Sequence, residues 1–212
     1  MMKILMWNVY NGFQDGSKRE LLPAQERRSF ALKWVHEQDV DVVGLLELQN
    51  FREADFGALF RAWGHGNGQF LKGRYPMGLS SRIPIGNPIR HNVGMSHGLI
   101  AVEQGPITLI LTHIPPKEYG DRAQELRTLL ECLLPVMKRQ RPVILMGDLN
   151  AALDAPLPTA LSALGLLPLL PQSRRDHVFV SANLAESVEA NVEWSSELER
   201  ISDHFPIHIR VR

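Results

Sequence analysis

Two side chains that could do chemistry follow one apolar stretch of the sequence. Residues 143–146 (VILM) predict a buried strand, and Gly147 lets the backbone turn before Asp148, Leu149 and Asn150. In extended geometry, Asp148 and Asn150 would point to one side while Leu149 points into the core. The carboxylate can accept a proton or hold a cation, and the amide can donate to an anion. An ordinary Asp/Asn turn after a strand is the alternative interpretation.

Other apolar runs in the chain also begin or end at side chains with acid, base or metal-binding chemistry. Polar groups in layered α/β proteins gather at strand ends, so these residues are expected to meet at one rim of a sheet. The remaining members of this set are Asn8, Glu47, His113, Asp176, Asp203 and His204.

Three of these residues suit a divalent cation. Glu47 lies inside the apolar run 40–48, where a bare charge is costly unless it is paired, protonated or bound to a cation. Glu47 and Asp203 are hard oxygen ligands for Mg²⁺, and the amide of Asn8 with several waters would complete an octahedron. A structural ion pair of Glu47 with Arg82 or Arg122 is the alternative.

The other residues suit attack of water on a phosphoryl centre. Asp148 can orient and deprotonate a water, while Asn150 and a protonated His204 can stabilise charge on phosphoryl oxygens. A core histidine satisfied by a backbone carbonyl is the alternative for His113, and a surface turn is the alternative for Asp203 and His204. The histidines at 65, 91 and 97 are expected to be solvated in loops. Arg174 and Arg175 are expected to be a solvated pair, with a phosphate clamp as the alternative.

The apolar patterning predicts the elements that must position these residues. Apolar or alternating runs predict strands, and three-to-four spacing predicts helices. Residues 64–78 are Gly-rich and predict a loop joined to a strand, and Pro84 and Pro88 predict that residues 81–88 form a turn region. The expected helices are 24–38, 51–63, 119–140 and a short one near 159–164, and the expected strands are 4–7, 40–48, 77–81, 97–103, 107–112, 143–146, 174–181, 187–194 at an edge, and 205–211.

Composition limits the class of protein. The chain has 212 residues with no internal repeat or linker, which predicts a single domain over residues 1–212. Equal numbers of basic and acidic residues, 23 each, argue against non-specific coating of nucleic acid. The lone Cys132 and an amino terminus that resembles neither a signal peptide nor a membrane span predict a cytoplasmic protein. A monomer is the default expectation.

The motifs taken together resemble the endonuclease/exonuclease/phosphatase superfamily of deoxyribonuclease-I-like proteins. They occur in family order and span nearly the whole chain, and G-D-x-N followed some fifty residues later by S-D-H-x-P is specific in combination. The matching motifs are W-N at Trp7–Asn8, L-E-L-Q around Glu47, S-R-I-P-I at Ser81–Ile85, T-H at Thr112–His113, G-D-L-N at Gly147–Asn150, D-H-V-F-V-S from Asp176, and S-D-H-F-P-I at Ser202–Ile207.

The resemblance implies an α/β fold, a four-layered two-sheet sandwich with helices outside, and Mg²⁺-dependent hydrolysis of phosphoric esters, with Mn²⁺ as a substitute. It implies that Glu47 binds metal with Asn8 and Asp203 close by, and that Asp148 activates or positions the water. It also implies that Asn150 and His113 contact the phosphate. Asp176 would orient His204 and fix its tautomer, so that His204 donates to the phosphate.

The substrate is less determined than the reaction. His113 stands where the abasic-site endonuclease branch usually has tyrosine, which favours phosphodiesterase and phosphatase branches, and residues 151–172 leave little room for long recognition insertions. A phosphodiesterase acting on a small or single-stranded nucleic acid is the first hypothesis. The alternatives are a phosphatase or phosphodiesterase of small molecules or lipid headgroups, a binding module for a phospho-ligand or protein without turnover, and a metal-independent glycosidase using Glu47 and Asp148.

Overall fold

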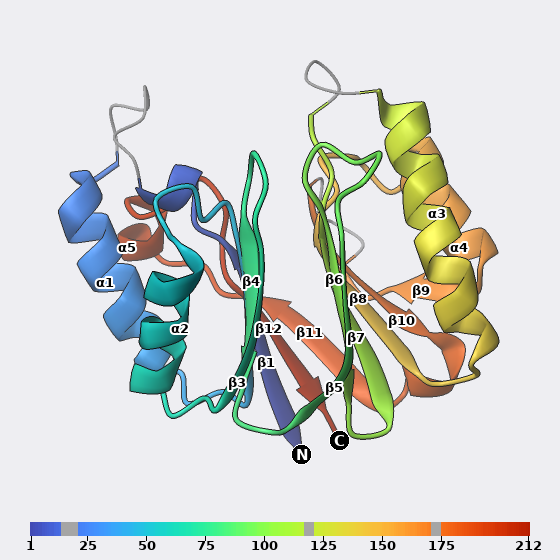
Figure 1. Cartoon of the computed structure of the whole chain (residues 1–212), viewed down its shortest axis with the longest axis horizontal. Coiled ribbons are helices and arrows are strands. Elements are labelled where there is room, and N and C mark those ends of the chain that lie inside the picture. The colour runs from blue at the N-terminus through green and yellow to red at the C-terminus, as the bar shows by residue number, and fades with distance from the viewer. Residues whose placement is uncertain (14–20, 117–120, 171–174) are drawn as a thin grey trace.

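Two six-stranded mixed sheets face each other in the computed structural model, which describes residues 1–13, 21–116, 121–170 and 175–212 (Figure 1). The first sheet has the order β11 (Val188–Val192), β12 (Ile207–Val211), β1 (Met2–Asn8), β2 (Val42–Leu46), β4 (Met77–Ser81), β3 (Asn67–Leu71). The second has the order β5 (Ile85–His91), β6 (Gly98–Gln104), β7 (Ile107–His113), β8 (Val143–Asp148), β10 (Asp176–Ser181), β9 (Leu166–Pro168). The α/β fold predicted from the sequence is confirmed.

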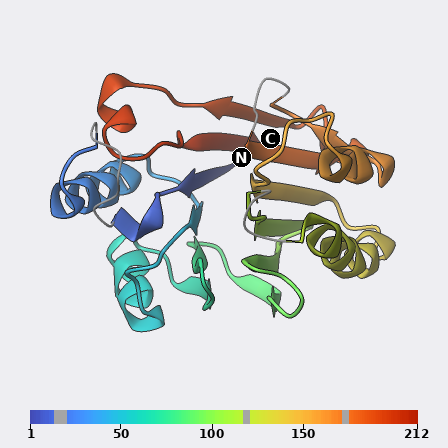
Figure 2. The ribbon, with the colours of Figure 1, turned by 90° about the horizontal axis from the view of Figure 1, so that it is seen from above.

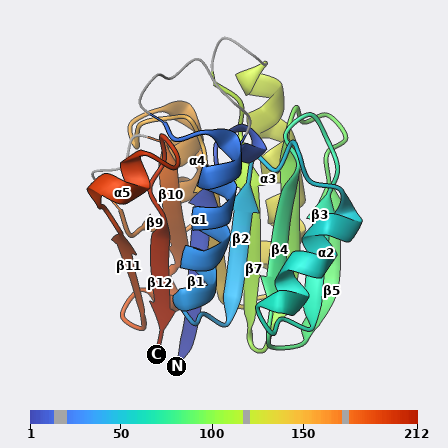
Figure 3. The same ribbon diagram turned by 90° about the vertical axis from the view of Figure 1, so that its left-hand side faces the viewer.

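Helices cover the outer face of each sheet, as Figures 2 and 3 show. Three pack on the first sheet, namely α1 (Ala24–Glu37), α2 (Glu53–Ala62) and the short α5 (Ser196–Glu199). Two pack on the second, namely α3 (Arg122–Lys138) and α4 (Pro156–Ala163). Two 3₁₀ turns, η1 (Asn11–Phe13) and η3 (Ala182–Leu184), complete the described elements. The result is four layers, with helices outside and two sheets inside.

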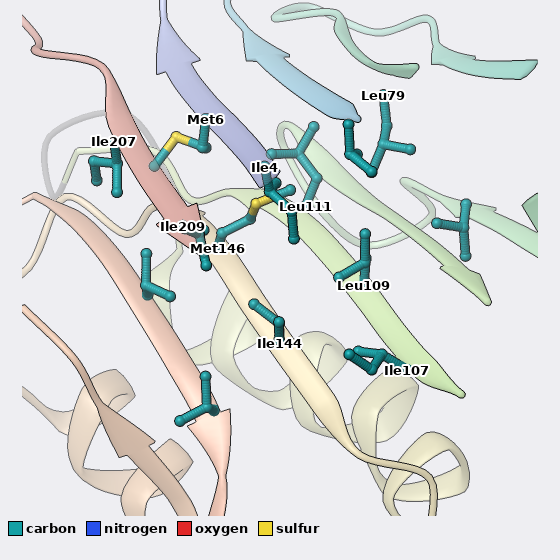
Figure 4. Close-up of a cluster of buried hydrophobic side chains, with 14 of the residues drawn as sticks. Ile4, Met6, Leu79, Ile107, Leu109, Leu111, Ile144, Met146, Ile207 and Ile209 are labelled. Atoms are coloured by element: carbon teal, nitrogen blue, oxygen red, sulfur yellow. The ribbon is translucent and has the colours of Figure 1, made fainter. Parts of the chain in front are cut away.

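The central strands are buried on both faces, which explains their continuous apolar runs. In β1, Ile4 and Met6 belong to the core between the two sheets, while Leu5 and Trp7 belong to the core beneath the helices of the first sheet. The core between the sheets is drawn in Figure 4. Because side chains alternate along a strand, any polar residue that continues the inward row at a strand end faces the space between the sheets.

Several predicted boundaries were wrong. Residues 85–91 form the strand β5 rather than a turn region, and its pairing with β6 shifts register between Gly86 and Ile89. Pro88 is tolerated there because β5 is an edge strand with an irregularity at that point. The Gly-rich segment contains β3, and the sequence patterns did not predict β9 or α5.

The long predicted helix begins at a defined cap. The Asp121 side chain accepts hydrogen bonds from the backbone N–H groups of Ala123 and Gln124, so α3 starts at Arg122. Residues 119 and 120, which the prediction also included, lie outside the described residues. No helix within the described ranges is long and apolar enough to cross a membrane.

Candidate active site

Strand register places three predicted site residues side by side. His113 is the partner of Asp148 in the parallel pair β7–β8, and Asp176 is its partner in the antiparallel pair β8–β10. Each continues the inward row of its own strand, as Leu111 and Met146 show for β7 and β8. The second sheet therefore presents an imidazole and two carboxylates at one end of the inter-sheet space.

The first sheet contributes Asn8 and Glu47 to the same place. Asn8 ends β1, and its Nδ2 donates to Glu47 Oε1 at 2.9 Å and to Asp148 Oδ2 at 3.1 Å. Glu47 follows β2 and also accepts from the backbone N–H of Asn11 at 2.8 Å. Its φ of 61° is in the left-handed region, a costly conformation for a residue with a Cβ. The two sheets are thus joined by polar contacts around these carboxylates.

Gly147 allows the second sheet to bring Asp148 into this position. Its φ is 158°, and a Cβ at this residue would lie 1.8 Å from the carbonyl oxygen of Thr112 on the neighbouring strand. No side chain can occupy that space without moving β7 or β8. The glycine that the sequence motif places before Asp148 is therefore required by a close backbone approach.

The turn after Asp148 is held by hydrogen bonds rather than by extended geometry. Asn150 has φ 45°, and its backbone N–H donates to Asp148 Oδ1 at 2.8 Å. Asn150 Nδ2 donates to the carbonyl oxygen of Ile114 at 2.9 Å. Arg122 donates to the carbonyl oxygens of Leu149 and Asn150 at 2.8 and 2.9 Å. Asp148 is thus both a candidate site residue and part of an Asp/Asn turn. The expectation of extended geometry through Asn150 was wrong.

His204 approaches from the loop before β12. Its Nδ1 donates to Asp176 Oδ2 at 2.7 Å, and its Nε2 lies 3.6 Å from Asp148 Oδ2. Its backbone carbonyl accepts a hydrogen bond from the indole N–H of Trp7 at 2.9 Å, which ties the loop to β1. The alternative of a surface turn at His204 was wrong, because its side chain is buried.

The charges of Asp148 and His204 depend on each other. Burial, with the nearby Asp176 and Glu47 charges, raises the pKa of Asp148 to about 7, although His204 opposes this shift. Burial disfavours the charged form of His204, but the charge and hydrogen bond of Asp176 together with Asp148 and Asp203 raise its pKa to about 9. A carboxyl group that changes protonation near neutral pH beside a protonated imidazole is suited to acid–base chemistry.

His113 is buried beside the two carboxylates. Its Nε2 lies 3.7 Å from Asp148 Oδ2 and 3.9 Å from Glu47 Oε1. Burial, with His97 and His204 nearby, holds the pKa of His113 well below its ordinary value, so its ring is neutral. The His97 ring packs edge to face on the His113 ring, with 4.2 Å between ring centroids. The same ring stacks on Tyr75, also with 4.2 Å between ring centroids. The prediction that His65 and His97 are solvated was wrong, because both are buried.

Two groups of side chains have the geometry to hold a cation. Within the described parts of the chain, ligand atoms within 4.8 Å of one another occur in Glu47, His113 and Asp148, and in Asp148, Asp176 and His204. Carboxylate oxygens fit a hard divalent ion, and buried Asp176 Oδ1 has no hydrogen-bond partner among the described residues. Neither Arg82 nor Arg122 is the partner of Glu47, because Arg82 pairs with Asp39 and Arg122 binds carbonyls.

The other two predicted metal ligands have different partners in this structure. The nitrogen of the Asn8 amide faces Glu47 and Asp148, while its oxygen accepts from the backbone N–H of Tyr10 at 3.1 Å. An oxygen ligand from Asn8 therefore requires this amide to turn over. Asp203 Oδ2 lies 3.3 Å from Arg175 Nη1, and Asp203 is in neither of the two groups above. Of the three predicted ligands, Glu47 is the one that belongs to a group of side chains with the geometry to hold a cation.

Arg175 is a residue of this site that the sequence patterns did not predict. Its Nη1 lies 3.4 Å from His204 Nε2 as well as near Asp203. The expectation that Arg174 and Arg175 form a solvated pair holds only in part for Arg175, because its side chain is 49% exposed but its guanidinium contacts Asp203 and His204. Arg174 lies outside the described residues. Its position directly before Asp176 is the only signal in the sequence that could have indicated this role.

The fold and this site define a deoxyribonuclease-I-like α/β sandwich with acidic and histidine side chains at one rim. A family model described as the Endonuclease/Exonuclease/phosphatase family matches residues 6–204. The chain belongs to this family. A search of curated proteins found no match.

Solved structures with the same fold include an endonuclease and a phosphatase. An AP endonuclease from Archaeoglobus fulgidus is 19% identical, with 100% of this chain and 99% of that chain covered and a TM-score of 0.69. The 3′ phosphatase NExo from Neisseria, bound to product DNA hairpin, is 19% identical, with 100% of each chain covered and a TM-score of 0.79. The human Nocturnin catalytic domain with bound sulfate is 16% identical, with 100% of this chain and 94% of that chain covered and a TM-score of 0.77.

Proposed function

We propose that this protein is a Mg²⁺-dependent hydrolase of phosphoric esters, a phosphodiesterase with nuclease activity. Attack by water would be in line, without a covalent enzyme intermediate. The observation that carries the proposal is the environment of Asp148 Oδ2, which lies 3.1 Å from Asn8 Nδ2, 3.6 Å from His204 Nε2 and 3.7 Å from His113 Nε2. One buried carboxylate is thus set among groups that can hold a water and an anion.

Each side chain has a role in this proposal. Asp148 orients the attacking water and accepts its proton, and His204 donates from Nε2 to a phosphoryl oxygen. Asp176 accepts from Nδ1 of His204, which fixes the tautomer and orientation of the ring. The neutral His113 and the amide of Asn150 supply further hydrogen bonds to the phosphoryl group.

The metal belongs to the same proposal. Glu47 would hold Mg²⁺, with Asn8 and Asp203 as the further ligands and Mn²⁺ as a substitute. A bound divalent ion would polarise the phosphoryl group and neutralise charge that develops on its oxygens. The carboxylates of Glu47 and Asp148 are both within 3.1 Å of Asn8 Nδ2, which supports a cation position between them, since two neighbouring carboxylates repel unless a positive charge lies nearby.

Nucleic acid is the first substrate we propose. Two structures with this fold are described as an AP endonuclease and as a 3′ phosphatase bound to a DNA hairpin, and this supports a DNA or RNA substrate. The formal net charge of zero favours a short or single-stranded substrate over extended duplex binding. A small phosphoester or a lipid headgroup is the second candidate, because a net charge of zero is also compatible with such a substrate.

Hydrolysis of a substrate panel tests the proposal. The panel contains a chromogenic diester and monoester, single- and double-stranded DNA, RNA and a phospholipid, each with Mg²⁺, Mn²⁺ or EDTA. Asp148→Ala should lower turnover by about a thousandfold or more, since removing one member of a catalytic unit has effects of this size. Asp154→Ala is the matched control, because Asp154 is exposed six residues further along the chain. Equal rates in wild type and Asp148→Ala would refute the mechanism.

Metal dependence needs a second variant. Glu47→Gln should shift the Mg²⁺ titration of activity to higher concentrations, because it removes the charge of the proposed ligand. An unchanged titration would remove this role from Glu47. Folded wild-type protein that binds Mg²⁺ but hydrolyses no member of the panel would favour a phospho-ligand or protein-binding module on the same fold.

A further inference from the structure

Arg175 is held beside the reacting groups by its backbone. Its carbonyl oxygen accepts a hydrogen bond from the N–H of Leu149 at 2.8 Å, which fixes residue 175 next to the turn that follows Asp148. The next residue, Asp176, starts β10 and is the register partner of Asp148. The side chain of Arg175 therefore starts from a backbone position that is held at the rim of the site.

The guanidinium has donors that no described protein group uses. Nη1 lies 3.3 Å from Asp203 Oδ2 and 3.4 Å from His204 Nε2. Arginine has five N–H donors and no acceptor, and within the described ranges its partners contact Nη1 alone. With 49% of the side chain exposed, Nη2 and Nε can receive a ligand from solvent.

We propose that Arg175 binds the non-bridging oxygens of the substrate phosphate, next to Nε2 of His204. This inference rests on the proposed function. A separation of 3.4 Å between Nη1 and Nε2 allows one oxygen to lie within hydrogen-bond distance of both nitrogens. Asp203 would then act as a positioning residue that directs the guanidinium toward the phosphate. Arginine suits this task because its planar fork matches the spacing of two phosphate oxygens.

A direct contact with phosphate predicts selectivity between substrates. The attraction between a guanidinium and a phosphate grows in proportion to the phosphate charge. A terminal phosphomonoester carries about two negative charges at neutral pH, and an internal diester carries one. Arg175 should therefore favour terminal phosphomonoesters, such as a phosphorylated strand end, more than it favours internal diesters. A purely structural arginine would affect both substrates equally.

The chain contains a matched control for an exposed arginine in an ion pair. Arg139 Nη1 lies 3.4 Å from Glu103 Oε1, and its side chain is 51% exposed. It caps the end of α3, and neither partner belongs to the site. Arg139→Ala thus removes a comparable ion pair without touching the region around Asp148.

The first experiment measures kcat and KM for a chromogenic phosphomonoester and diester with Mg²⁺. Arg175→Ala should lower kcat/KM for the monoester by about ten- to a hundredfold, the range for losing a charge-assisted hydrogen bond, and mainly through KM. The loss of kcat/KM for the diester should be smaller. Arg175→Lys should recover part of the kcat/KM that Arg175→Ala loses. Arg139→Ala should leave kcat/KM for both substrates unchanged. Equal losses for both substrates, or no loss, would overturn the inference.

The second experiment does not require turnover. Binding of inorganic phosphate to the protein is followed by ³¹P line broadening, with and without Mg²⁺. Arg175→Ala should weaken phosphate binding, and Arg139→Ala should leave it unchanged. If wild type binds phosphate through Arg175 but hydrolyses nothing, the proposed function fails and the inference stands. Equal binding by wild type and Arg175→Ala, or none by wild type, would overturn it.

Discussion

Burial shifts the two kinds of titratable side chain at this site in opposite directions. Burial disfavours charge. Together with the nearby Asp176 charge it raises the pKa of Asp148 to about 7, and together with the nearby Arg74 charge it lowers the pKa of His97 to about 4. The two shifts have opposite effects on stability. The contribution of Asp148 to the free energy of unfolding is present below its ordinary pKa of 3.8 and is lost as the pH rises through 7. The contribution of His97 is present above 6.5 and is lost as the pH falls toward 4.

The contribution of His97 can be isolated by a difference measurement. His97→Phe keeps a ring to stack on Tyr75 but cannot be protonated. As the pH falls from 7 to 4, the free energy of unfolding of the variant minus that of wild type should rise by about 3 kcal/mol, which follows from the 2.5-unit difference between 6.5 and about 4. Urea unfolding at several pH values measures this difference. A difference that is constant with pH would contradict a buried, neutral His97.

At the scale of the element, β8 determines how closely the two halves of the site approach. It is buried throughout, and its neighbours β7 and β10 supply His113 and Asp176 in register with Asp148. The strand can reach this position only because Gly147 has no Cβ against Thr112. A side chain at residue 147 would therefore change both the spacing of β7 and β8 and the position of Asp148 in the site.

Gly147→Ala should destabilise the protein by about 3 kcal/mol or more, since the new methyl group meets backbone atoms that can move only with β7. The control is Gly165→Ala, at a residue with φ 83° and no atom within 4 Å of the added Cβ. That variant has backbone strain alone, which costs about 1 to 2 kcal/mol. Urea unfolding midpoints compare the two. Equal losses would show that β7 and β8 can separate without cost.

At the scale of the whole molecule, the core between the sheets joins two halves that each have their own helix-covered core. Asn8 and Glu47 come from one half, and Asp148 and His113 from the other. Neither sheet has a complete site alone. Residues 1–212 are therefore expected to unfold as a single domain.

The positions of the tryptophans allow a test of this cooperativity. All belong to the half with the first sheet, at Trp7, Trp34, Trp63 and Trp194. Leu145→Ala opens a cavity in the helix-covered core of the other half and should cost about 3 kcal/mol. Tryptophan fluorescence and far-UV circular dichroism should both show the same lowered urea midpoint. An unchanged fluorescence midpoint would indicate two independently unfolding units, and Leu134→Ala, on the exposed side of α3, is the control.

The apolar patterns of the sequence predicted most of the strands and helices of this protein and the residues proposed for its site. Apolar runs that are buried on both faces identify central strands, and three-to-four spacing identifies α1 and α3, because both patterns arise from local burial of side chains. A polar residue that ends such a run must lie at a sheet rim. Asn8, Glu47, His113, Asp148 and His204 could therefore be predicted as one cluster.

The contacts between these groups depend on the tertiary structure. Strand order and register bring Asp176 and His113 to Asp148, and both depend on pairing between segments far apart in the chain. The contact of His97 with His113 and the position of Arg175 beside His204 come from adjacent strands and loops, which leave no periodic pattern in the sequence. The edge strand β5 was missed because Pro88 opposes pairing locally, while its neighbour β6 offers a free edge that a bulged strand can still join.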